Sequence, residues 1–83
     1  MRVKYFAWVR ERIGLAEEEI SLPDDVDTAG DLIRFLKRRG EGYEHALERA
    51  AFIRVAADQQ HVSHDVSIRT AREVALFPPM TGG

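Results

Sequence analysis

The sequence contains no cysteine among its 83 residues. Disulfide bonds, thiolate metal sites and cysteine nucleophiles are therefore excluded for this chain. If the protein handles sulfur, that sulfur cannot be carried on a side-chain thiol of its own. Any sulfur chemistry must use another part of the chain.

Long apolar runs and a strong charge of either sign are also missing. No stretch approaches the roughly 18 consecutive apolar residues that suggest a membrane span. The start, Met1-Arg2-Val3-Lys4, lacks the apolar segment of a signal peptide. The formal net charge is -2 without an acidic or basic tail, which argues against nucleic acid as the main partner. We expect a cytoplasmic protein that binds neither membrane nor nucleic acid.

Recognisable enzyme and metal motifs are missing as well. There is no nucleotide-binding glycine loop, no catalytic triad and no helical zinc motif. His61 and His64 lie close in sequence, but no complete ligand set is visible around them, and His45 stands apart. We expect all three histidines to be surface or structural residues, with no metal site in the domain.

The residues that are present describe one small α+β domain over residues 1–83. Hydrophobic residues make up 45% and charged residues 31% of the chain, which is typical of a globular domain near the lower size limit. Alternating apolar residues predict a first strand over residues 2–9. A short helical turn over residues 10–13 then ends at Gly14. Further strands are predicted at 18–22, 52–57, 61–63 and 73–77.

The strongest helix signal begins at Thr28, which with Asp31 forms the pattern of a capping box. Apolar residues at helical spacing predict a helix over residues 29–39, followed by Gly40 in a left-handed conformation. A second short helix is predicted over residues 43–50. This element order predicts about five strands packed against one main helix and short helices.

The last residues of the sequence, Gly82 and Gly83, are poor material for regular structure, because glycine loses much conformational freedom and has no side chain to pack. One interpretation is a frayed end or an expression remnant. The other is a tail that threads a narrow channel of a partner protein. The threading segment would then consist of Pro78, Pro79, Met80, Thr81 and Gly82 ahead of Gly83. The prolines stiffen its exit, and residues 80–83 reach at most about 13–14 Å.

An α-carboxyl group at Gly83 suggests a specific chemistry. Its pKa near 3.3–3.7 makes it an anion at neutral pH and a poor electrophile. Adenylation by ATP would supply a leaving group, and a sulfur donor could then displace AMP to leave a thiocarboxylate. Glycine suits this reaction because no Cβ hinders attack. The adenylation site and the sulfur acceptor site must then belong to other proteins.

Apolar residues beside the tail are candidates for a partner interface. If the first and last strands are neighbours, Phe6, Leu76 and Phe77, with a smaller contribution from Trp8, form an outward apolar patch, and such patches mark interaction surfaces. The alternative is that the short helices cover these residues.

The chain resembles the small, sulfur-carrying subunits of molybdopterin synthase. The resemblance spans essentially the whole chain, and its last eleven residues are its most specific part. The matching segments are Val3-Lys4-Tyr5-Phe6-Ala7, Val9-Arg10-Glu11, Asp31-Leu32 and residues 73–83. The resemblance implies a ubiquitin-like β-grasp fold with a mixed sheet.

The same resemblance implies that the Gly83 thiocarboxylate donates sulfur to cyclic pyranopterin monophosphate during molybdenum cofactor biosynthesis. It implies a large catalytic subunit as partner, in a heterotetramer, and a ubiquitin-activating-type enzyme that adenylates Gly83. The chain would be non-catalytic alone, with transient AMP and sulfur in place of a permanent cofactor. Two positions depart from the family pattern, namely Ala71-Arg72 where relatives have Gly-Asp, and His61 where they place an apolar residue.

Other functions remain open on the sequence. A related β-grasp carrier for thiamine or another thiolated product would share the Gly-Gly chemistry. A ubiquitin-like modifier would share the adenylate but form isopeptide bonds with lysines, and a plain interaction domain would not use its tail. Phe77-Pro78-Pro79 favours the molybdopterin carrier.

Overall fold

The computed structural model describes residues 1–79 of the chain. In chain order the elements are β1 (Arg2–Tyr5), α1 (Ala7–Ile13), β2 (Glu17–Glu19), α2 (Ala29–Lys37), α3 (Glu41–Ala46), the 3-10 helix η1 (Ala50–Phe52), β3 (Arg54–Ala57), β4 (Gln60–Val62) and β5 (Glu73–Phe77). Within these residues, no helix is long and apolar enough to cross a membrane.

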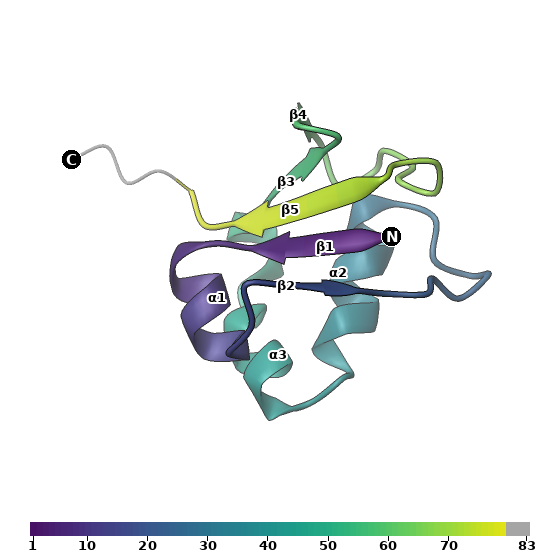
Figure 1. Cartoon of the computed structure of the whole chain (residues 1–83). Coiled ribbons are helices and arrows are strands. Elements are labelled where there is room, and N and C mark those ends of the chain that lie inside the picture. Colours follow the sequence, from purple (N-terminus) through teal and green to yellow (C-terminus); the bar gives the residue numbers. More distant parts are fainter. Residues whose placement is uncertain (80–83) are drawn as a thin grey trace.

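The five strands form one mixed sheet in the order β2-β1-β5-β3-β4. β1 and β5 run parallel at the centre, and the other neighbours are antiparallel. The α-helices lie on one side of this sheet, and the chain leaves it at the end of β5 (Figure 1). The predicted fold, a ubiquitin-like β-grasp of the α+β class, is confirmed.

The core lies between the sheet and the helices. Alternate residues of the three inner strands point into it, and each is at most 2% exposed: Val3, Tyr5, Val55, Val74 and Leu76. Helix α2 supplies Leu32, Ile33 and Leu36 from its buried face. Each such side chain contributes about 1.5–3 kcal/mol of burial free energy, so the sheet and α2 hold each other in place.

Helix α2 begins where the sequence predicted. The Thr28 hydroxyl accepts a hydrogen bond from Asp31 N at 3.1 Å, and the Asp31 carboxylate accepts one from Thr28 N at 3.1 Å. The helix ends at Lys37 rather than Arg39, with Arg38 as its C-cap. The prediction of a left-handed conformation for Gly40 is wrong. This residue has φ 159° and ψ 173° and leads directly into α3. Glycine is nearly alone in tolerating that conformation.

The first strand is shorter than predicted. It ends at Tyr5, and the residues from Ala7 to Ile13 form α1. Phe6 N still donates to Leu76 O at 3.1 Å, but the next bond of a parallel ladder would need an N–H from residue 78. That residue is Pro78, which has none, so the carbonyl of Phe6 instead accepts from Val9 and Arg10 and starts the helix.

Three other strand boundaries also differ from the prediction. β2 covers 17–19 rather than 18–22, because it pairs only with residues 2–4 of β1 and the residues after it have no partner strand. β3 begins at Arg54 because Phe52 belongs to η1, and β4 is shifted by one residue to 60–62. The last strand, 73–77, is confirmed at both ends.

A candidate docking surface at the exit of the last strand

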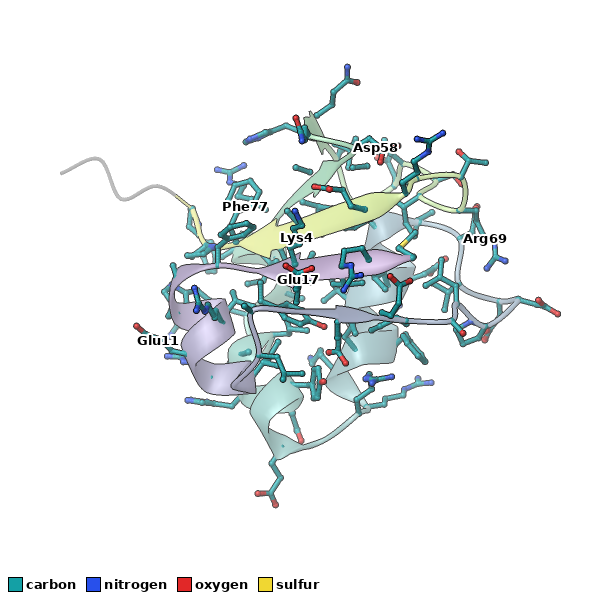
Figure 2. The ribbon with its side chains drawn as sticks, viewed as in Figure 1. Lys4, Glu11, Glu17, Asp58, Arg69 and Phe77 are labelled. Carbon is teal, nitrogen blue, oxygen red and sulfur yellow. The ribbon has the colours of Figure 1, made fainter. Side chains whose placement is uncertain are left out.

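β5 is the strand from which the C-terminal segment leaves the sheet. It lies between β1 and β3, ends at Phe77, and continues into Pro78 and Pro79 (Figures 1 and 2). The predicted site residues Met80, Thr81, Gly82 and Gly83 lie outside the described residues. The structural evidence therefore concerns the surface around the exit.

Phe77 faces away from the helices, because it alternates with the buried residues Val74 and Leu76 along β5. Phe6 lies beside it on the neighbouring chain segment and is 47% exposed. Two of the three residues predicted for the outward patch are therefore found together. Such an arrangement places exposed aromatic surface where the tail begins, as a partner interface would require.

Leu76 does not belong to this surface, and its predicted outward position is wrong. It is 0% exposed and part of the core. Successive side chains of a strand point to opposite faces, so Leu76 and Phe77 cannot both face outward. Trp8 is only partly buried, but it lies on α1 rather than on a strand, with the Arg12 guanidinium 4.7 Å from its ring centroid.

Two further residues complete the surface: His61, at a position where the family resemblance implies an apolar contact on the partner-facing sheet, and Arg54, which the sequence did not indicate. His61 of β4 meets Phe77 edge to face, with ring centroids 5.2 Å apart and planes at 66°. Arg54 of β3 lies directly opposite Phe77 in the register and is exposed. We call Phe6, Arg54, His61 and Phe77 the exit surface. The departure at His61 therefore puts an imidazole, rather than an aliphatic side chain, against Phe77.

The turn before β5 is organised by Asp58. One carboxylate oxygen of Asp58 accepts hydrogen bonds from Arg72 N at 2.9 Å and Glu73 N at 3.1 Å. Asp58 also has a positive φ of 48°, which an aspartate tolerates better than most residues. These bonds fix the start of β5 even though the chain has Ala71-Arg72 at this turn.

A partly buried carboxylate joins the sheet to the helices on the opposite face. Glu18 accepts hydrogen bonds from Tyr5 Oη at 2.8 Å, Tyr43 Oη at 2.6 Å and Arg39 Nη2 at 3.2 Å. Burial, followed by the hydrogen bond to Glu18, raises the pKa of Tyr5 far above its ordinary value. Both effects favour the neutral phenol, so the cluster is a structural link rather than a reactive group.

The histidines lie in three separate places. His64 Nε2 is 2.7 Å from the carbonyl oxygen of Ile53. This contact holds the loop that follows β4 against the residue that precedes β3. His45 is exposed on α3, and His61 belongs to the exit surface. Among residues 1–79, no three side chains of the metal-binding types come together.

Comparison with known proteins places this fold in a family. A model of the ThiS family matches residues 3–83. The chain belongs to the ThiS family. The match includes β5, all of β1 after Arg2, and the whole exit surface.

Curated relatives in this family match over almost their entire length. The chain is 35% identical to the molybdopterin synthase sulfur carrier subunit of Haemophilus influenzae, covering 100% of this chain and 99% of the relative. It is 34% identical to the subunit of the same name from Escherichia coli, with the same coverage.

Solved structures agree with this assignment. A putative molybdopterin converting factor, subunit 1, from Pyrococcus furiosus has a TM-score of 0.73 and 34% identity, covering 94% of each chain. SAMP1 from Haloferax volcanii has a TM-score of 0.71 and 29% identity, covering 100% of this chain and 98% of the other. The ThiS family chain described here therefore shares its β-grasp architecture with both proteins.

Proposed function

We propose that this protein is a sulfur carrier of molybdenum cofactor biosynthesis and acts as the small subunit of molybdopterin synthase. The observation that carries the proposal is the full-length similarity, at 34–35% identity, to relatives named molybdopterin synthase sulfur carrier subunit. Family membership and the direction in which β5 sends the C-terminal segment out of the sheet support it.

Gly83 is the reactive residue in this proposal. Its carboxylate attacks ATP in the site of a ubiquitin-activating-type enzyme, which releases pyrophosphate and leaves an acyl adenylate. A sulfur donor displaces AMP, and the product is the Gly83 thiocarboxylate. Within the synthase complex, the sulfur passes to cyclic pyranopterin monophosphate and the carboxylate is restored by water.

The folded domain is the part of the chain that both partner enzymes bind. The exit surface binds the large synthase subunit, while the tail from Pro78 to Gly82 carries Gly83 into that subunit's active site. Rigid placement of the reacting group is worth several kcal/mol in such reactions, because it replaces an encounter in solution by a bound geometry. The catalytic side chains and the substrate pocket belong to the large subunit, so the carrier needs no permanent cofactor.

A ubiquitin-like modifier is the second candidate function. The observation in its favour is the similarity to the H. volcanii small archaeal modifier protein 1, with a TM-score of 0.68 and 28% identity over 95% of each chain. Both functions begin with the same acyl adenylate. They differ in whether a sulfur donor or a lysine amine displaces AMP.

Intact-protein mass spectrometry distinguishes the two. The chain is incubated with ATP, the activating enzyme and a sulfur source, and the C-terminal peptide is then mapped. A mass shift equal to one oxygen-to-sulfur exchange at Gly83 supports the carrier. A lysine-linked conjugate without that exchange would favour the modifier. Adding the large subunit and cyclic pyranopterin monophosphate then tests whether the thiolated form yields molybdopterin.

A further inference from the structure

The outer face of the sheet divides into two halves with different charge patterns. On the β1 side, Arg2 contacts Glu17 at 3.2 Å and Glu19 at 3.3 Å. The Lys4 ammonium lies 3.5 Å from Glu73. The cations on this half therefore already have carboxylate partners within the chain.

Among residues 1–79, Arg54 on the other half has no such partner. It alternates with the buried Val55 and is exposed on the outer face of β3. Within residues 1–79, no carboxylate lies within 4 Å of its guanidinium. A guanidinium carries five N–H donors in a fixed plane, so Arg54 can make a bidentate bond to an incoming carboxylate.

The immediate surroundings of Arg54 strengthen such a bond. Phe77 lies directly opposite it, and the His61 ring contacts Phe77 from the next strand. When a partner covers these rings, water is excluded, and a buried guanidinium without a carboxylate becomes strongly unfavourable. A partner that covers Phe77 must therefore either supply a carboxylate to Arg54 or bind weakly.

A phosphate-rich partner fits this face less well than an acidic protein. Glu17, Glu19 and Glu73 lie on the same face, and the chain has a formal net charge of -2. A polyanion such as nucleic acid would be repelled across most of the sheet. A single Asp or Glu side chain beside an apolar recess matches Arg54 beside the ring of Phe77.

We infer that Arg54 determines partner specificity by donating to a carboxylate of the protein that receives the tail. This inference rests on the proposed function, because it identifies the receiving protein as the large synthase subunit. The carboxylate comes from an Asp or Glu beside the recess that holds Phe77. Phe77 supplies apolar contact area, while Arg54 rejects partners that lack the acid.

The first test measures binding to the cognate large subunit by titration calorimetry at several salt concentrations. Arg54→Gln should weaken binding about tenfold and reduce its salt dependence, and Arg54→Glu should weaken it about a hundredfold through like-charge repulsion. Arg38→Gln is the matched control, because it removes an exposed arginine at the end of α2 and should leave the affinity unchanged. Unfolding midpoints of all variants establish that the fold is intact.

The second test identifies the acid directly. Arg54→Lys places an amine at the same position, and a water-soluble carbodiimide then joins it to a carboxylate in contact. The chain has just two lysines of its own, Lys4 and Lys37, and their cross-links also form with the unmodified protein. The expected result is one additional cross-link to an Asp or Glu peptide of the large subunit.

The outcomes separate this inference from the proposed function. If Phe77→Ala weakens the complex while Arg54→Gln, Arg54→Glu and the cross-link give no effect, the role of Arg54 is overturned and the carrier function stands. If the unmodified protein does not bind the large subunit, both are overturned. Equal losses of affinity for Arg54→Gln and Arg38→Gln would also overturn the role of Arg54, since the net charge of the chain would then explain the binding.

Discussion

The imidazole of His61 contacts the ring of Phe77 across the intervening strand β3, with centroids 5.2 Å apart. On that strand Ala56 pairs with His61 and Arg54 pairs with Phe77, so the two rings meet diagonally. The small side chain of Ala56 leaves room for this diagonal contact. The contact connects edge strand β4 to the strand that carries the tail, and so fixes the aromatic surface at the exit.

Phe77→Ala is expected to weaken binding to the large synthase subunit more than it destabilises the fold. The ring is partly exposed on the outer face, so its removal leaves the core intact. Aromatic anchors at interfaces are worth about 2 kcal/mol or more, which corresponds to about 30-fold in affinity. Calorimetric titration and urea unfolding measure the two effects separately.

Leu76→Ala, at the neighbouring position, is expected to destabilise the fold more than it weakens binding to the large subunit. This side chain is 0% exposed, so truncation should cost about 2–5 kcal/mol of folding stability. If Phe77→Ala proved the more destabilising of the two while leaving the affinity unchanged, the assignment of Phe77 to the exit surface would be wrong.

Deleting Gly83, or adding residues after it, is expected to abolish sulfur transfer while leaving the fold unchanged. The proposed adenylation requires the carboxyl group of this residue to be terminal, whereas the core lies entirely within residues 3–76. Thiocarboxylate formation is followed by mass spectrometry, and the unfolding midpoint by circular dichroism. Normal activity of an extended variant that is shown by its mass to be untrimmed would contradict the proposal.

Tyr5→Phe is expected to lower stability by about 1 kcal/mol, because it removes one hydrogen bond to the Glu18 carboxylate. Tyr43→Phe removes the second bond. The double variant should cost more than the sum of the two, since the partly buried carboxylate then keeps only Arg39 as a hydrogen-bond partner. Urea unfolding of the four proteins in this cycle measures the coupling, and strict additivity would show that the bonds act independently.

Stability should depend on pH through Asp31 at the start of α2. Hydrogen bonds from the backbone of Thr28 and Asp27, and from the side chain of Arg34, lower the pKa of Asp31 to about 2. A lowered pKa means that the stabilisation is complete above the unfolded value of about 3.9 and is lost as the pH falls towards about 2. The stability difference between the wild type and Asp31→Asn should therefore shrink over this range.

Urea unfolding at a series of pH values from neutral to strongly acidic checks this expectation. Asp24→Asn is a charge-matched control, because within the described residues its carboxylate makes no hydrogen bond or ion pair. A difference between the wild type and Asp31→Asn that stays constant down to the lowest pH would show that the capping box does not depend on the charge.

Local signals in the sequence were sufficient for several elements. The start of α2 was predicted from Thr28 and Asp31 because the two residues that cap the helix are only three positions apart. The end of β5 was predicted from Pro78, because a residue without an N–H ends a ladder regardless of its surroundings. The Gly-Gly ending and the segment before it suggested the chemistry of the tail, although residues 80–83 are outside the described structure.

The direction of side chains on β5 could not be predicted in the same way. Val74 and Leu76 alternate with Ala75 and Phe77, and both pairs are apolar, so Glu73 at the start of the strand is the one polar residue of β5 that indicates the solvent side. The error at Leu76 follows from this ambiguity. The end of β1 was missed for a related reason, because Val9 fits both a period of two and the helical spacing to Ile13.

The sequence by itself determined the fold class, the helix start and the sulfur-carrier hypothesis, since these depend on neighbouring residues and on the similarity of the whole chain. Only the tertiary structure decided which face of β5 is buried, that His61 meets Phe77, and that Arg54 lies opposite Phe77 without a carboxylate partner among residues 1–79. Strands distant in the sequence come together in the sheet, and their register sets these contacts. The two-residue turn at Asp58 and Gln59 sets the register of β3 and β4, whereas the register of β5 with its neighbours has no local signal, because packing of the whole core fixes it.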